Sequence, residues 1–119
     1  GAGKSVLARG IARGLGISGP VQSPTFTLLN IYEEGRLPFY HFDVYRLEAE
    51  DEMEALGYED CFYGEGVTVM EWPQRIQGLL PEDRLDIRLE MGSDDLRRSI
   101  GLDARGEASA ELIKEAGLA

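Results

Sequence analysis

The chain opens on a glycine-rich stretch, Gly1-Ala2-Gly3-Lys4-Ser5, which matches the end of the pattern G-x-x-x-x-G-K-[ST]. The two glycines let backbone N–H groups curl around a phosphate, because neither carries a Cβ. The lysine can reach the β and γ phosphates of a nucleotide, and the serine hydroxyl can ligate Mg²⁺. A helix that starts here directs its positive N-terminal dipole at the same anion. The alternative interpretation of so short a match is a flexible N-terminal tail.

The front of this motif is missing from the chain. In proteins that carry the motif, the glycine-rich turn follows a buried parallel strand. That strand and the leading glycine would both lie upstream of residue 1. We therefore expect residues 1–119 to be a single domain of this type, N-terminally truncated, with the first strand absent.

The composition limits the classes of protein that the chain can belong to. A hydrophobic content of 43% is enough for one core. There is no apolar run of membrane-spanning length and no visible signal peptide, so we expect a cytoplasmic protein without membrane contact. Cys61 is the only cysteine, and it cannot form an internal disulfide. It lacks a nucleophile signature, and we expect it to act as a small hydrophobic residue.

The negative charge is concentrated in the second half of the chain. Residues 1–50 carry five basic and five acidic side chains, whereas residues 51–119 carry seven basic and 17 acidic ones and hold the whole net charge of −10. Nucleic-acid backbones bind to basic surfaces, so we expect no strong direct binding of nucleic acid. The acidic half is either a solvated surface or a face for a basic protein partner.

The periodicity of the sequence predicts alternating helices and strands, hence the α/β class. With the phosphate-binding motif, this indicates a P-loop NTPase-like mixed sheet flanked by helices, with a β-hairpin insertion. The expected elements are a helix over 4–15 ended by Gly16, a hairpin over 26–45, an acidic helix over 48–56, a buried strand over 66–71, strands over 85–91 and 100–103 paired across a turn, and a helix over 108–116.

Four further motifs accompany GAGKS: SPTF over 23–26, HFDVYR over 41–46, EWP over 71–73 and LPEDRL over 80–85. In this order and spacing they resemble the TsaE family, also known as YjeE. Members of that family are small P-loop ATPases of bacterial tRNA threonylcarbamoyladenosine synthesis. The resemblance runs from residue 1 to about residue 90 and is weak beyond it.

The resemblance implies a Mg²⁺ site made by Ser5, Asp43 and Glu71. A carboxylate among aromatic residues, such as Asp43, is costly unless it is paired or bound to metal. Glu71 ends a hydrophobic run, where a Walker B acid stands at the tip of a parallel strand. The alternatives are a strand-end aspartate that caps a turn and a solvent-facing strand end.

The resemblance also implies a catalytic set of Lys4, Glu71 and Thr25, with Thr25 in a loop that senses the γ-phosphate. A plain loop that enters a strand is the alternative for Thr25. The residues expected to bind ATP are Gly1, Ala2, Gly3, Lys4, Ser5, Val6 and Arg97.

Three other residues of these motifs are less specific. Trp72 packs either beside the nucleotide or simply in the core, and Arg46 pairs with the acidic helix or lines the site. We expect His41 to be a structural histidine, because it has no companion of the metal-binding kind.

Three functions fit this pattern to different degrees. The first is a Mg²⁺-dependent ATPase, weak alone, that supports tRNA modification by a partner complex; the resemblance implies a TsaD–TsaB pair. The second is a nucleotide-dependent binding module in which the ATP or ADP state sets partner docking and hydrolysis is incidental. The third, a small-molecule kinase, is disfavoured because no arginine-rich lid insertion is evident.

Overall fold

The computed structural model describes residues 4–22, 24, 27–91 and 98–116. These fall into two compact units, one of Lys4–Leu79 and one that contains the described residues from Leu80 onward. Within the described ranges, no helix is long and apolar enough to cross a membrane. The expectation of a single domain over residues 1–119 stays a prediction.

The first element of the Lys4–Leu79 unit is helix α1 (Lys4–Gly14), as the sequence predicted. Its C-terminal end is closed by Gly16, whose φ of 87° lies in the left-handed region that favours glycine. The Gly16 N–H donates to the carbonyl of Arg13, and the Ile17 N–H donates to that of Ala12. These two hydrogen bonds together form a Schellman cap, which satisfies carbonyls that the end of a helix leaves unpaired.

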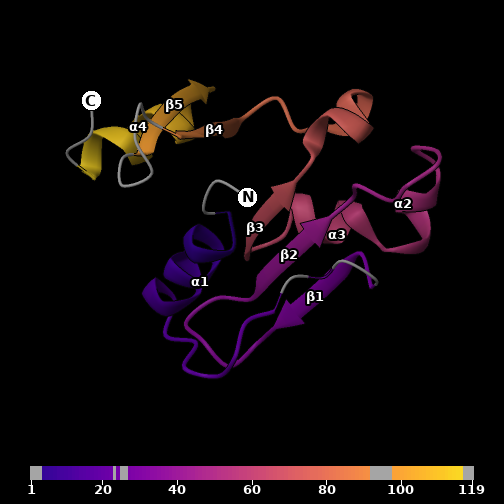
Figure 1. Ribbon diagram of the computed structural model, residues 1–119, viewed down its shortest axis with the longest axis horizontal. Coiled ribbons are helices and arrows are strands. Elements are labelled where there is room, and N and C mark those ends of the chain that lie inside the picture. Colours follow the sequence, from indigo (N-terminus) through magenta and orange to yellow (C-terminus); the bar gives the residue numbers. More distant parts are fainter. Residues whose placement is uncertain (1–3, 23, 25–26, 92–97, 117–119) are drawn as a thin grey trace. The chain divides into compact units, whose positions relative to one another are not determined.

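A three-stranded sheet forms the centre of this unit, in the order β1-β2-β3 (Figure 1). Strands β1 (Leu29–Tyr32) and β2 (Phe39–Asp43) form the predicted antiparallel hairpin. Strand β3 (Val67–Glu71) pairs in parallel with β2. The sheet is therefore mixed, and the α/β class with its hairpin is confirmed.

One face of the sheet is covered by α1. Alternate residues of a strand point to the same face, so Phe39, His41 and Asp43 share one side of β2. Phe39 is fully buried in a cluster with Ala12, Leu15 and Ile17 from α1 and the turn after it. The apolar stripe of α1 thus packs on the face that also carries His41 and Asp43.

The opposite face of the sheet is covered by helix α3 (Tyr58–Phe62), which the sequence analysis did not predict. The Phe42 and Phe62 rings meet edge to face, with 5.6 Å between centroids. Cys61 is buried, as expected, and burial raises the pKa of its thiol. The Thr68 hydroxyl of β3 donates to the Cys61 carbonyl, which ties α3 to the sheet.

Two predictions about this unit were wrong. The acidic helix is short, α2 (Glu52–Ala55), because the Glu52 carboxylate accepts the N–H groups of Glu48 and Ala49 and holds those residues in a turn. Strand β3 is half-buried rather than buried, since β2 is its only neighbour in the described sheet. The segment η1 (Pro73–Leu79), which consists of 3₁₀ turns interrupted by a non-helical backbone at Ile76, follows β3 and was not predicted.

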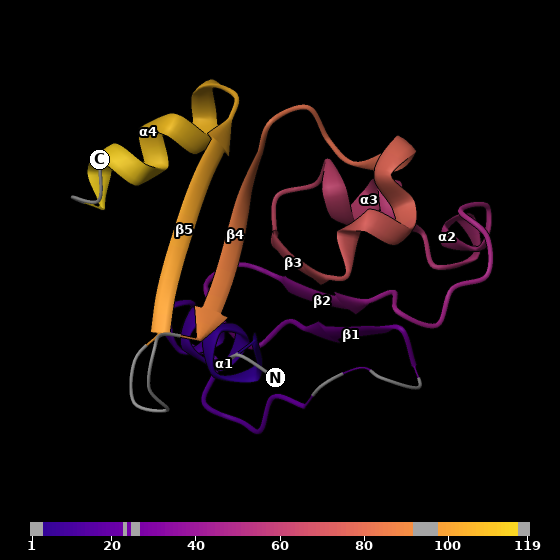
Figure 2. The ribbon, with the colours of Figure 1, turned by 45° about the horizontal axis from the view of Figure 1, so that its top comes forward.

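The second unit is a β-ribbon with a helix. Strands β4 (Arg84–Met91) and β5 (Arg98–Arg105) pair antiparallel, and helix α4 (Glu107–Glu115) follows (Figure 2). The predicted pairing of these strands and the terminal helix are confirmed. The predicted connecting turn lies outside the described residues.

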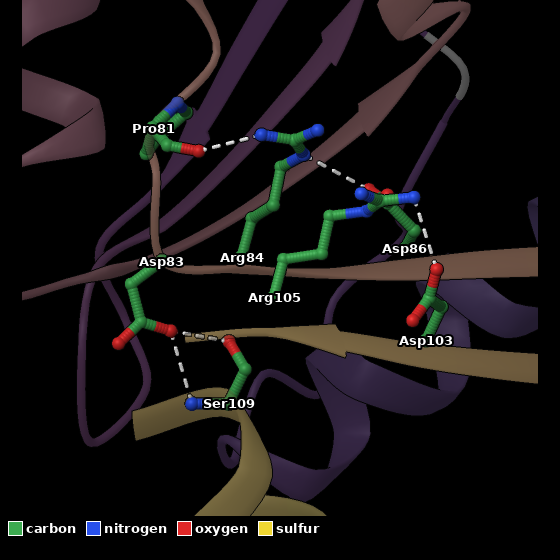
Figure 3. Close-up of polar contacts among 7 residues, drawn as sticks. All are labelled: Pro81, Asp83, Arg84, Asp86, Asp103, Arg105 and Ser109. Atoms are coloured by element: carbon green, nitrogen blue, oxygen red, sulfur yellow. Dashed lines mark hydrogen bonds and ion pairs between the residues drawn. The ribbon is translucent and has the colours of Figure 1, made fainter. Parts of the chain in front are cut away.

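The start of α4 is held by the carboxylate of Asp83, the residue directly before β4. It accepts the N–H of Ala108 at 2.9 Å. It also accepts the N–H and the hydroxyl of Ser109, at 3.0 and 2.7 Å (Figure 3). Asp83 thus does the work of a capping side chain, which the glycine at the N-cap, Gly106, cannot do. These hydrogen bonds lower the pKa of Asp83, and the one from the Ser109 hydroxyl has the largest effect.

We expect Asp83→Asn to loosen the start of α4. The lowered pKa of Asp83 in the folded state means that its stabilising effect is present above its ordinary pKa and is lost as pH falls through the folded value. The protection of the Ala108 and Ser109 amides from hydrogen exchange, measured relative to the intrinsic exchange rate at each pH, should fall in the variant at neutral pH and in the wild type only in acid. Glu82→Gln, at an exposed neighbour, is the control. Equal exchange in both variants would contradict the capping role.

Candidate functional site

Two carboxylates meet where the parallel strands end. Asp43 is the last residue of β2 and Glu71 the last of β3, and the two are direct register partners. Paired residues of neighbouring strands point to the same face, with their Cα atoms about 4.8 Å apart. Asp43 is only 8% exposed, and the Glu71 side chain only 12%. The sheet therefore brings two mostly buried acidic groups together.

The first turn of α1 lies toward the same end of the sheet. The end of α1 packs on Phe39, the first residue of β2, through Ala12. From there to Lys4 the helix runs back about 12 Å, close to the roughly 13 Å from Phe39 to Asp43 along β2. Ala8, midway along α1, is buried, and Figure 1 shows the helix running in the direction opposite to β2, so its first turn is the part nearer to the ends of the strands. The positive end of the helix dipole thus lies on the side of the acidic pair.

Asp43 has two kinds of contact in its surroundings. Its Oδ1 accepts the N–H of Tyr45 at 3.2 Å, so it does cap a turn, as the alternative interpretation held. Its own N–H donates to the carbonyl of Leu28 at 2.9 Å, and the Leu28 N–H donates to Pro24. The segment that approaches β1 is therefore tied to the end of β2. One oxygen of the carboxylate, Oδ1, is therefore engaged in the turn.

Glu71 contacts the histidine that we expected to be structural. His41 Nε2 lies 2.9 Å from Glu71 Oε2, and the His41 ring is buried. The expectation of a packed histidine holds, but the contact with Glu71 was missed. The two residues are 30 positions apart, and only the parallel register of β2 and β3 makes them diagonal neighbours.

Trp72 follows Glu71 with an unusual backbone. Its φ of 65° is costly for a residue with a large side chain, and such strain is found most often at functional sites. The centroid of its ring lies 4.8 Å from that of the Tyr45 ring. The Arg75 guanidinium lies over the Tyr45 ring, with its Cζ 5.2 Å from the centroid. Trp72 is only partly buried, so it is not a simple core residue.

Several predicted site residues cannot be placed. Among the residues expected to bind nucleotide or sense it, Gly1, Ala2, Gly3, Thr25 and Arg97 lie outside the described residues. Lys4 and Ser5 begin α1, but their side chains are not among those described. Val6 is 65% exposed on α1, and Arg46 is exposed after β2.

The residues present suit a hard divalent cation. Two carboxylates at directly paired positions repel each other unless a positive charge lies between them. Carboxylate and hydroxyl oxygens are ligands that Mg²⁺ prefers. Among the described residues, no three His, Cys, Asp or Glu side chains gather as a metal-binding cluster. The predicted set of Ser5, Asp43 and Glu71 completes its third position with a hydroxyl, and it stays a prediction.

A mixed α/β sheet with acidic residues at two neighbouring strand ends, whose first helix begins with the K-S of a G-K-S sequence, is typical of a protein of the P-loop type. A profile of the family "Threonylcarbamoyl adenosine biosynthesis protein TsaE" matches residues 1–100. The chain belongs to the TsaE family.

Individual relatives agree with this assignment. The chain is 45% identical over 115 residues to the tRNA threonylcarbamoyladenosine biosynthesis protein TsaE of Bacillus subtilis, which covers 97% of this chain and 71% of that protein. Identity to the TsaE protein of Treponema pallidum is 46% over 96 residues, or 81% of this chain and 70% of that one. The crystal structure of Bacillus subtilis YdiB superposes with a TM-score of 0.84 at 38% identity, over 98% of this chain and 70% of that one.

Asp43→Asn tests whether the acidic pair is strained without a cation. Asparagine keeps an oxygen for the Tyr45 N–H but removes the repulsion from Glu71, which is worth about 0.2–1 kcal/mol. Without divalent cations the variant should unfold at the same or a slightly higher temperature than the wild type. With Mg²⁺ and nucleotide, the wild type should gain more stability than the variant.

Glu33→Gln, at an exposed acidic residue after β1, is the matched control and should respond to Mg²⁺ as the wild type does. Equal gains for wild type and Asp43→Asn, measured by calorimetry, would argue against a cation at this position.

Proposed function

We propose that this protein is a Mg²⁺-dependent ATPase that supports tRNA threonylcarbamoyladenosine biosynthesis through partner proteins. The observation that carries the proposal is the pair Asp43 and Glu71, mostly buried at adjacent strand ends on the face covered by α1. Membership of the TsaE family supports the pathway. The G-K-S sequence at the start of α1 supports a nucleotide phosphate as the ligand.

Each residue would have a distinct task at this site. Lys4 and the N–H groups at the start of α1 would bind the ATP phosphates. Ser5, Asp43 and Glu71 would hold Mg²⁺, which when bound neutralises charge on the phosphate oxygens. Glu71 would also accept a hydrogen bond from the attacking water and orient it. Thr25 would contact the γ-phosphate.

Hydrolysis itself is tested by Glu71→Ala. If the ATPase interpretation is right, turnover stimulated by the partner complex disappears in this variant while nucleotide is still bound. If the protein is instead a binding module whose nucleotide state controls partner docking, the Glu71→Ala variant still binds the partner, and turnover is low in both the wild type and the variant. Steady-state phosphate release with and without purified partners separates the two.

Lys4→Ala should weaken nucleotide binding far more than Arg9→Ala. Loss of a charged hydrogen-bond donor costs about 1.5–3 kcal/mol, or roughly 10- to 150-fold in affinity. Arg9 lies on an exposed position of the same helix, so its removal changes charge without touching the phosphates. Titration with a fluorescent nucleotide measures both variants. Equal affinities would refute the role of Lys4.

We infer that the partner is a protein complex of the TsaD–TsaB type rather than tRNA bound directly. The net charge of −10, all of it beyond residue 50, opposes contact with a nucleic-acid backbone. Asp51, directly before α2, and Glu54, within α2, are exposed and acidic. An acidic surface of this kind is complementary to a basic patch on a partner protein. The attraction between the two would accelerate their association at low salt.

Reversing the charges of Asp51 and Glu54 to lysine should slow association with the partner by about tenfold at low salt and leave ATP binding intact. Glu50 and Glu52 are unsuitable for this test, because they accept backbone N–H groups of Gly78 and of Glu48 and Ala49. Reversal of Glu111 and Glu115, exposed on α4, is the control. Equal effects of the two double variants would show that only net charge matters.

A further inference from the structure

The His41 ring is the most unusual buried group of the Lys4–Leu79 unit. It is 1% exposed and lies on the face of β2 that α1 covers. Nε2 is within 2.9 Å of Glu71 Oε2, while Nδ1 is buried without a hydrogen-bond partner among the described residues. A buried polar atom left unpaired costs about 1–3 kcal/mol, so a purely apolar residue would suit the packing better. The contact with Glu71 is the interaction that a histidine makes at this position and an apolar residue could not.

The ring has little freedom to turn. It stacks on Phe39, with 6.0 Å between centroids and 24° between planes, and Phe39 in turn stacks on Tyr32 at 5.8 Å. Phe39 is itself fixed by the cluster around Ala12 and Leu15. This row of rings connects the core under α1 to the carboxylate at the end of β3.

The geometry selects one arrangement of the imidazole proton. With hydrogen on Nε2, the ring donates to the Glu71 carboxylate. With hydrogen on Nδ1 alone, two lone pairs would face each other at 2.9 Å and a buried donor would be left unpaired. The first arrangement satisfies the carboxylate and leaves only an acceptor unpaired.

We infer that His41 is a positioning residue: its Nε2–H holds Glu71 Oε2, so that the other oxygen of Glu71 is presented toward the cation and the attacking water. This rests on the proposed ATPase function and assigns to His41 a role in it. Groups that orient a metal-binding carboxylate commonly matter for activity about 10- to 100-fold. His41 would bind neither nucleotide nor metal itself.

A matched pair of substitutions tests the inference. His41→Gln places an amide N–H close to the position of Nε2, whereas His41→Met has a similar shape and no donor. Turnover with saturating ATP and partner should fall about 10- to 100-fold in the methionine variant and recover most of that loss in the glutamine variant. Without Mg²⁺, the dissociation constant for ATP should stay unchanged in both variants, since the proposed phosphate-binding groups lie at the start of α1.

Phe42→Leu controls for damage to the core. Phe42 is as deeply buried on the same strand but faces α3 rather than α1. Its variant should lose thermal stability without the selective loss of turnover. Equal turnover in the methionine and glutamine variants, whether both high or both low, overturns the positioning role.

A spectroscopic measurement keeps this inference separate from the ATPase proposal. The chain has one histidine, so its imidazole ¹⁵N signals are assigned without ambiguity. In the protein without nucleotide, we expect a slowly exchanging Nε2–H and a bare Nδ1, with the Nε2 signal shifted in Glu71→Leu. If this is seen but wild-type protein and partners hydrolyse no ATP, the proposed function fails and the contact stands. An Nδ1–H ring, or signals insensitive to Glu71→Leu, overturns the inference even if hydrolysis is observed.

Discussion

The parallel pairing of β2 with β3 is the interaction on which the candidate site depends. Its register places Asp43 opposite Glu71 and sets His41 diagonal to Glu71. A slip of one residue would turn the side chains of one strand to the opposite face and separate the two carboxylates. The chemistry at this end of the sheet is thus fixed by backbone hydrogen bonds, before any ligand is considered.

Packing on the two faces of the sheet protects that register. On one side, Phe39 is enclosed by Ala12, Leu15 and Ile17. On the other side, Phe42 meets Phe62 of α3. Because β2 is buried on both faces, a slip of one residue would break both sets of packing contacts and move His41 and Asp43 to the face that packs on α3. The helix that bears the G-K-S sequence is therefore held by the same strand that carries Asp43.

The contacts of the acidic pair balance structure and reactivity. Asp43 gives one oxygen to a turn through the Tyr45 N–H, and Glu71 gives one to His41. Each contact orients its carboxylate. The strained backbone at Trp72, directly after Glu71, lies where such strain is usually kept for function. The residues of the proposed site therefore also have structural roles.

Local patterns in the sequence determined much of the fold. The apolar spacing of α1, the stop at Gly16, the hairpin of β1 and β2, and the alternation of β4 were all readable, because each depends on residues close together in the chain. The motifs also identified the family and the acidic residues at strand ends. The start of α2 at Glu52 rather than at residue 48 could not be foreseen, because it depends on how a single glutamate side chain, Glu52, folds back on the turn before it.

Only the tertiary structure decided which distant groups meet. Asp43 and Glu71 are separated by two helices, α2 and α3, and His41 reaches Glu71 across 30 positions. The capping of α4 by Asp83 spans 25 and 26 positions in the same way. Residue type and local spacing encode the propensity of each segment, whereas contacts of this kind arise from strand register and packing, which depend on the whole folded unit.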